Sequence, residues 1–233
     1  MDDTYQSLAQ RISRQLALKE PEEHKRLLIA MAGPPGSGKS TIAHQIVKHF
    51  ASMPSSPFIV AISVDGFHHS LATLRSLPNA AEALARRGAP WTFDGTAAAN
   101  LVQQLRNGAR RYSVTAPTFD HAVKDPVPDG LIVGPDVQVC LLEGNYLLSD
   151  EAPWDGIVPS VDDCWLVQVD PSLARSRVAK RHLMSGIEDT MESALKRADE
   201  NDLLNGEYVI RHSEGRYDVL IESVEDGKSS MII

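Results

Sequence analysis

A glycine-rich segment of nine residues has the residue types needed to bind phosphate groups. It reads Gly33-Pro34-Pro35-Gly36-Ser37-Gly38-Lys39-Ser40-Thr41 and fits the pattern G-x-x-x-x-G-K-[ST]. Glycines adopt backbone angles closed to other residues, so successive N–H groups can turn toward phosphate oxygens. Lys39 is expected to reach the β- and γ-phosphates of a nucleotide, and the Ser40 hydroxyl to ligate Mg²⁺. The segment predicts a phosphate-binding loop (P-loop) for ATP and Mg²⁺.

Two carboxylates come at the ends of predicted strands. Asp65 follows the apolar residues 58–64, and Glu143 follows the apolar residues 137–142. Ligands of open α/β sheets bind beyond the carboxyl ends of the strands, so both side chains are expected near the bound phosphates. One carboxylate can hold Mg²⁺ while the other accepts a proton from an attacking hydroxyl. The alternative for each is a carboxylate that caps a nearby turn.

The elements that must position these groups alternate between strands and helices. A strand over 27–32 ends where the P-loop begins, and a helix over 40–50 follows it. Residues 66–95 are predicted to be helical in patches, and residues 116–136 hold too many prolines and glycines for one long element. This alternation predicts one α/β domain over residues 1–233, a mostly parallel sheet with helices on both faces. The other expected strands are 58–64, 137–142, 164–169 and 217–223, and the other expected helices are 5–18, 96–105, a basic helix after Pro171, and 190–204.

The composition is that of an ordinary globular chain with an acidic balance. The 233 residues are 42% hydrophobic and carry a net charge of −8, which argues against nucleic acid or an anionic membrane as a general partner. No apolar run approaches the ~20 residues that span a bilayer. The acidic amino terminus argues against a secretory signal, so we expect a cytoplasmic protein. Its two cysteines, Cys140 and Cys164, lie in apolar stretches and are expected to be reduced core residues.

Over residues 27–223 the chain resembles the P-loop kinase superfamily of uridine kinase, phosphoribulokinase and bacterial-type pantothenate kinase. Within it, the chain is most similar to a branch described as fructose-transport-like kinases. The P-loop pattern is shared by many NTPases, whereas the ordered set of motifs is much more selective. The motifs that carry the resemblance are the P-loop, Val64–His68 (VDGFH), Arg87–Asp94 (RGAPWTFD), Pro117–His121 (PTFDH), Leu142–Tyr146 (LEGNY) and a basic helix that ends near Gly186.

The resemblance implies a P-loop NTPase three-layer sandwich with a small lid. It implies that Asp65 is the base that activates the acceptor hydroxyl and that Glu143 supports Mg²⁺ with Ser40. Residues 1–24 would form an N-terminal helix and connector, residues 66–136 an inserted acceptor-binding region, and residues 171–204 the lid and the following helix.

Two arginines of the basic helix are candidates for contact with the transferred phosphate. Arg177 and Arg181 are four residues apart and share one face of the helix. Guanidinium groups that close over a phosphate stabilise its developing charge, and the resemblance places a lid at this helix. The alternative is a solvated basic face on an acidic protein.

The same motifs supply the candidates for contact with the acceptor. His68 is equally compatible with an ordinary loop histidine, and the aromatic residues near Pro90 with local packing of the insertion. The predicted acceptor contacts are His68, Trp91, Phe93, Asp120, His121, Asn145 and Tyr146.

The function expected from these residues is an ATP-dependent kinase acting on a hydroxyl of a small metabolite. Sugars, nucleosides and pantothenate-like or glycerate-like compounds all remain open as acceptors. The rival interpretation is a regulatory P-loop ATPase without a small-molecule acceptor, and a third is an inactive binding module derived from a kinase. The oligomeric state is not indicated by the sequence.

Overall fold

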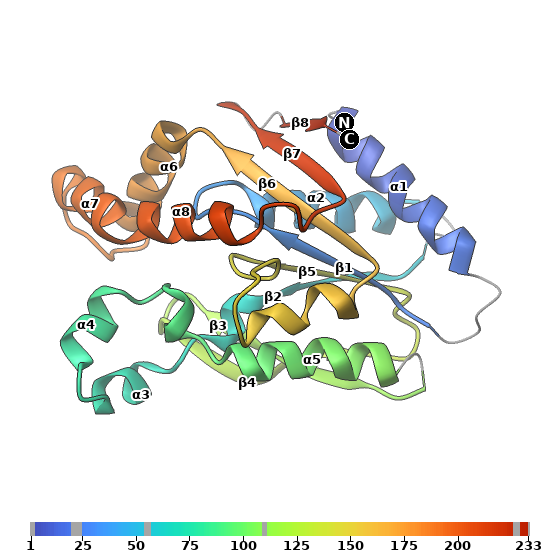
Figure 1. Ribbon diagram of the computed structural model, residues 1–233, viewed down its shortest axis with the longest axis horizontal. Coiled ribbons are helices and arrows are strands. Elements are labelled where there is room, and N and C mark those ends of the chain that lie inside the picture. Colours follow the sequence, from blue (N-terminus) through green and yellow to red (C-terminus); the bar gives the residue numbers. More distant parts are fainter. Residues whose placement is uncertain (1–2, 20–24, 54–56, 109–110, 226–228, 233) are drawn as a thin grey trace.

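The P-loop lies at the carboxyl ends of the parallel strands of the main sheet. The computed structural model describes residues 3–19, 25–53, 57–108, 111–225 and 229–232. In these residues a six-stranded sheet has the order β2-β5-β1-β6-β7-β8, parallel except for the β7–β8 pair (Figure 1). The strands are β1 (Leu27–Ala32), β2 (Ile59–Ser63), β5 (Val139–Gly144), β6 (Asp163–Val169), β7 (Val219–Ser223) and β8 (Ser229–Ile232). The predicted parallel sheet is confirmed, with β8 added.

Helices cover both faces because the central strands are apolar on both sides. All six residues of β1 are buried, and their side chains alternate between two cores. Leu27, Ile29 and Met31 pack in the core formed with helices α1 (Asp3–Lys19) and α2 (Lys39–Ala51). Leu28, Ala30 and Ala32 pack in the core formed with α5 (Gly95–Gly108) and α8 (Leu203–His212). This arrangement is the α/β sandwich expected from the sequence.

The segment between β2 and β5 contains a β-hairpin that the sequence did not reveal. Strands β3 (Val114–Asp120) and β4 (Asp125–Val133) pair antiparallel, and their register shifts once, between Ala116 and Thr118. Prolines at positions 117, 126 and 128 hide the strand pattern, but a separate two-stranded sheet tolerates them because its edges need no further pairing. The short helical patches predicted before the hairpin are η1 (Val64–Phe67), α3 (Leu71–Ser76), α4 (Ala80–Ala85) and η2 (Pro90–Thr92).

The basic helix after β6 is α6 (Pro171–Met184), which begins at Asp170. The Asp170 carboxylate accepts hydrogen bonds from the backbone of Ser172 and Leu173, and Pro171 occupies the first turn. Gly186, with φ +60°, follows the helix in the left-handed region. The helix expected over 190–204 is longer, since α7 (Met191–Arg197) continues through a π-helical turn, η5 (Ala198–Asp202), into α8.

Two projecting parts flank the carboxyl ends of the parallel strands. Figure 1 shows α6 and α7 above this end of the sheet, and α3, α4 and the β3–β4 hairpin below it. The remaining short elements are η3 (Trp154–Gly156) and η4 (Val158–Ser160). Both cysteines are free and buried, and burial raises the pKa of each thiol to about 12. Among the described residues, no helix is long and apolar enough to cross a membrane.

Candidate active site

The P-loop joins the end of β1 to the start of α2. Gly36 and Gly38 have φ values of +81° and +89°, a region that favours glycine. The Lys39 side chain is buried, and its Nζ donates to the carbonyl oxygens of Gly33 at 2.7 Å and Pro34 at 3.0 Å. The loop thus folds around its own lysine, which must leave these carbonyls to reach a phosphate.

The two predicted carboxylates lie at the same edge of the sheet as the P-loop. Glu143 pairs in register with Met31 of β1 and Ser63 of β2, and Asp65 lies in η1 directly after β2. The Ser40 hydroxyl donates to Glu143 Oε1 at 3.1 Å. This arrangement agrees with the expectation that both carboxylates face the phosphate site.

Burial and charge shift the ionisation of this group of residues. Burial lowers the pKa of Lys39 from 10.5 to about 8, although the charges of Glu143 and Asp65 oppose the shift. Burial also raises the pKa of the Glu143 carboxyl, and the nearby charge of Asp65 adds to that rise. A cation bound here would offset the mutual repulsion of the two carboxylates.

The residue types at this edge fit Mg²⁺. Hydroxyl and carboxylate oxygens are the ligands that Mg²⁺ prefers, and the ion usually keeps waters and substrate phosphates as its other ligands. Among the described residues, no group of three or more His, Cys, Asp or Glu side chains could hold a metal ion. The Ser40 hydroxyl and the Glu143 carboxylate are two oxygen ligands that suit a cation whose other ligands are waters and nucleotide phosphates.

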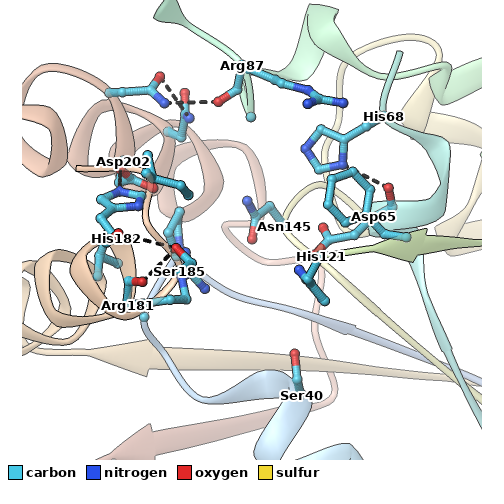
Figure 2. A pocket seen from close by; sticks show the side chains of 18 of the residues that line it. Ser40, Asp65, His68, Arg87, His121, Asn145, Arg181, His182, Ser185 and Asp202 are labelled. Carbon is cyan, nitrogen blue, oxygen red and sulfur yellow. Dashed lines mark hydrogen bonds and ion pairs between the residues drawn. The ribbon is translucent and has the colours of Figure 1, made fainter. Parts of the chain in front are cut away.

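A cavity of about 570 Å³ extends from the P-loop to the β3–β4 hairpin and to helices α6–α8 (Figure 2). Its P-loop end is lined by the phosphate-binding residues and the two carboxylates. Its distal end is lined by residues of the inserted segment and the helices beyond α6. The predicted residues that line this cavity are Pro35, Gly36, Gly38, Lys39, Ser40, Thr41, Asp65, His68, Phe93, His121, Glu143, Asn145, Arg177 and Arg181.

Three predicted acceptor contacts do not line the cavity. The prediction for Tyr146 is wrong, because its ring is buried among Phe93, Trp154 and Tyr208 in the core. Trp91 is 44% exposed. Asp120 caps the hairpin turn, since its Oδ1 accepts from the backbone N–H groups at positions 122 and 123.

Three residues of the predicted nucleotide-binding segment also lie outside the cavity lining. The carbonyls of Gly33 and Pro34 hold Lys39, and the Ser37 hydroxyl is buried without a hydrogen-bond partner among the described residues. These residues lie on the side of the loop that faces away from the cavity. Its phosphate-facing surface comes from the other P-loop residues.

His68 presents a defined hydrogen-bonding face. Its Nδ1 lies 2.8 Å from the backbone carbonyl of Asp65, and because a carbonyl only accepts, Nδ1 carries the proton. The ring packs on Phe93 with centroids 3.9 Å apart and on Phe119 with centroids 5.1 Å apart. Burial lowers the pKa of His68, so the ring is neutral and Nε2 is a hydrogen-bond acceptor.

The two predicted lid arginines have different environments. Arg177 donates to the carbonyls of Gly36 at 3.2 Å and Val224 at 2.7 Å and to Ser223 Oγ at 2.8 Å. Arg177 thus ties α6 to the P-loop and to the end of β7. The Arg181 side chain lines the cavity, and its charge contributes to the lowered pKa of Lys39. Arg181 is the better placed of the two to move onto a phosphate.

Several residues of the cavity were not singled out in the sequence. Arg87 had a signal, because it opens the RGAPWTFD motif, whereas Lys124 and Arg197 had none. Asn201, in the π-helical turn, donates from Nδ2 to the carbonyl of Arg87 at 3.0 Å. The other lining residues missed include His182, Ser185, Asp202 and Asn205.

The fold and its phosphate-binding loop define an α/β protein of the P-loop NTPase class. The family model described as "Phosphoribulokinase / Uridine kinase family" matches residues 28–174. The chain belongs to this family, as its motifs predicted.

Relatives and a solved structure agree with this assignment. The provisionally named uridine kinase C227.14 of Schizosaccharomyces pombe is 41% identical over 188 residues, which are 81% of this chain and 80% of that protein. The ATP-dependent kinase-like protein notR' of Aspergillus versicolor is 42% identical over 151 residues, 64% of this chain and 88% of that protein. A crystal structure from Silicibacter sp. TM1040, described provisionally as a fructose transport system kinase, superposes with a TM-score of 0.71 at 29% identity, covering 85% of this chain and 92% of that one.

Proposed function

We propose that this protein transfers the γ-phosphoryl group of ATP to a hydroxyl group of a small metabolite. Membership of a kinase family and the names of the relatives support an ATP-dependent kinase. The observation that carries the proposal is that Asp65 lines the same cavity as the P-loop residues and lies between Ser40 and Arg87 (Figure 2). An acceptor in the distal end would meet the nucleotide at this carboxylate.

Asp65 is the general base in this proposal. The acceptor oxygen forms a bond to the γ-phosphorus while its proton passes to the Asp65 carboxylate, and ADP leaves with the electron pair of the broken P–O bond. Lys39 neutralises charge on the phosphates, and Ser40 and Glu143 would hold Mg²⁺, which would supply further neutralisation. Positioning and electrostatics account for most of the rate in such transfers.

The distal end supports a small-molecule acceptor in particular. Neutral His68 accepts a hydrogen bond through Nε2, and Phe93, Phe119 and His121 add ring surfaces. Asn145 points into the cavity between this end and the P-loop (Figure 2). Arg181 would reach the transferred phosphate from α6, which Arg177 holds against the P-loop.

The test is Asp65→Asn, which keeps the shape of the side chain and removes its basicity. The variant should bind MgATP as the wild type does and lose phosphoryl transfer by about 10²- to 10⁴-fold. Binding is measured as the thermal shift with MgATP, and transfer as ADP release with a panel of hydroxylated metabolites. Asp120→Asn, the same substitution in a turn outside the cavity, is the matched control and should change neither.

Two results would contradict the proposal. Wild-type transfer by Asp65→Asn would remove the role of this residue. Steady ATP hydrolysis that no metabolite stimulates would support a regulatory ATPase, the rival class, whose carboxylate orients water.

A further inference from the structure

The cavity is basic although the whole chain is acidic. Among the described residues, six cationic side chains and three carboxylates line it, whereas the chain carries a net charge of −8. Three of the cations, Lys39, Arg177 and Arg181, lie on the nucleotide side. The other three form what we term the basic cluster: Arg87, Lys124 and Arg197.

The basic cluster comes together around the turn that follows α6. Lys124 Nζ donates to the carbonyl of Gly186 at 3.2 Å, and Arg197 Nη1 lies 3.9 Å from Glu188 Oε1. Arg87 Nη1 donates to the carbonyl of Lys124 at 2.6 Å. Lys124 and Arg197 thus contact the turn that follows α6, and Arg87 joins them through the backbone of Lys124.

The cluster has unused hydrogen-bonding capacity. The Nε atoms of Arg87 and Arg197 are buried, and neither has a hydrogen-bond partner among the described residues. A buried donor left unpaired costs stability, so such atoms usually have a ligand or water as partner. Lys124 has one hydrogen bond to the described residues and three N–H donors.

The carboxylates near the cluster pair with two of its three cations. Asp125 forms an ion pair with Arg87 at 2.9 Å, and Glu188 forms a longer one with Arg197 at 3.9 Å. Asp202, the one carboxylate outside the P-loop end among the described lining residues, is hydrogen-bonded to His182 Nε2 at 2.9 Å. Lys124 is thus the cation of the cluster that has no carboxylate partner among the described residues.

We propose that the basic cluster binds an acidic group of the acceptor, a phosphate monoester or a carboxylate. Guanidinium groups pair with both through charge-assisted hydrogen bonds. Figure 2 shows Arg87 and Ser40 on opposite sides of the cavity, with Asp65 and Asn145 between them. An acceptor anchored by its acidic group at the cluster would place its hydroxyl toward Asp65. The inference rests on the proposed kinase function and restricts its substrates to hydroxylated acids.

Anion binding can be tested without knowing the acceptor. With the P-loop saturated by Mg²⁺ and a non-hydrolysable ATP analogue, inorganic phosphate and acetate are added separately against sodium chloride of equal ionic strength. At tenfold excess over its dissociation constant, the preferred anion should raise the melting temperature by about 3 °C. Whichever anion does so identifies the acidic group as phosphate or carboxylate.

Substitutions in the basic cluster then test whether the anion binds there. Arg197→Gln and Lys124→Gln should each lose the anion-dependent shift, and Lys124→Arg should keep it. Arg175→Gln is the matched control, because Arg175 also belongs to the lid region but pairs with Asp199 on the surface, outside the cavity lining. No shift in the wild type with either anion, or a full shift in both glutamine variants, overturns the inference.

Paired acceptors separate this inference from the proposed function. ADP release is compared for ribose with ribose 5-phosphate and for glycerol with glycerate. Transfer only to the neutral compound of a pair, ribose or glycerol, would contradict the inference of an acidic acceptor. The proposed kinase function would still hold. A second outcome is that the cluster binds an anion but no acceptor stimulates ATP hydrolysis. This result would support the anion site and contradict the proposed kinase function.

Discussion

The P-loop end of the cavity comes mainly from one continuous segment between β1 and α2, whereas the distal end comes from segments far apart in the chain. At the P-loop end, the left-handed glycines and the position at a strand end define the site. At the distal end, Arg87 bonds to the carbonyl of Lys124, 37 residues away, and Asn201 to the carbonyl of Arg87, 114 residues away.

This difference suggests that the two ends have separate roles. The P-loop end binds the nucleotide through a widespread motif, and the distal end determines which acceptor binds. A local motif can be kept while the hairpin and the helices after α6 change around it. We therefore expect substitutions at the two ends to separate nucleotide binding from acceptor-dependent behaviour, and the following experiments test that separation.

Lys39→Ala should have the largest effect. Loss of the cation that faces the phosphates should lower turnover by about a thousandfold and weaken MgATP binding as well. Isothermal titration with MgATP and a turnover assay measure the two effects. Lys48→Ala, an exposed lysine on the same helix, is the control and should change neither. MgATP affinity equal to that of the wild type would contradict the assignment of Lys39.

Gly66→Ala should disturb the distal end and spare the P-loop. A Cβ at position 66 would lie 2.3 Å from the carbonyl oxygen of Pro117, so η1 and β3 must move apart. The free energy of unfolding should fall by about 1–3 kcal/mol, measured by urea denaturation. The stabilisation by MgATP should persist.

The control for this change is Gly156→Ala. It lies in another 3₁₀-helix, and nothing is within 4 Å of the added Cβ. Its stability should stay within about 0.5 kcal/mol of the wild type. Equal stabilities of the two variants would show that the close contact of Gly66 with the hairpin does not matter.

The smallest expected effect is the uptake of protons by Lys39 when a nucleotide binds. The pKa of Lys39 is lowered to about 8 by burial, and phosphates bound beside it should raise it again. Nucleotide binding should therefore take up most of a proton at pH 9 and close to none at pH 6.5. Titrations in buffers of different ionisation enthalpy measure this uptake. Equal uptake at both pH values would show that Lys39 is charged throughout.

The sequence was a good guide to the main sheet. Strands predicted at 27–32, 164–169 and 217–223 match β1, β6 and β7 within two residues. Their apolar runs are continuous because a central parallel strand is buried on both faces. The hairpin was missed because Pro117, Pro126 and Pro128 break the alternating pattern that identifies strands.

Predictions within the acceptor motifs were less uniform. His68, Phe93, His121 and Asn145 line the cavity, whereas Tyr146 packs into the core. A motif shows that residues belong together but not which side chain faces the cavity, since that depends on the direction of each side chain in the fold. The roles assigned to these residues remain predictions.

By itself, the sequence determined the phosphate-binding loop, the two carboxylates at strand ends and the parallel sheet. These features depend on backbone angles that glycine permits and on apolar runs read over a few residues. Only the tertiary structure decided that Arg87, Lys124 and Arg197 share one end of the cavity. Residues so distant in the sequence meet only when the hairpin and the helices after α6 pack around the same space, and no local pattern records that packing.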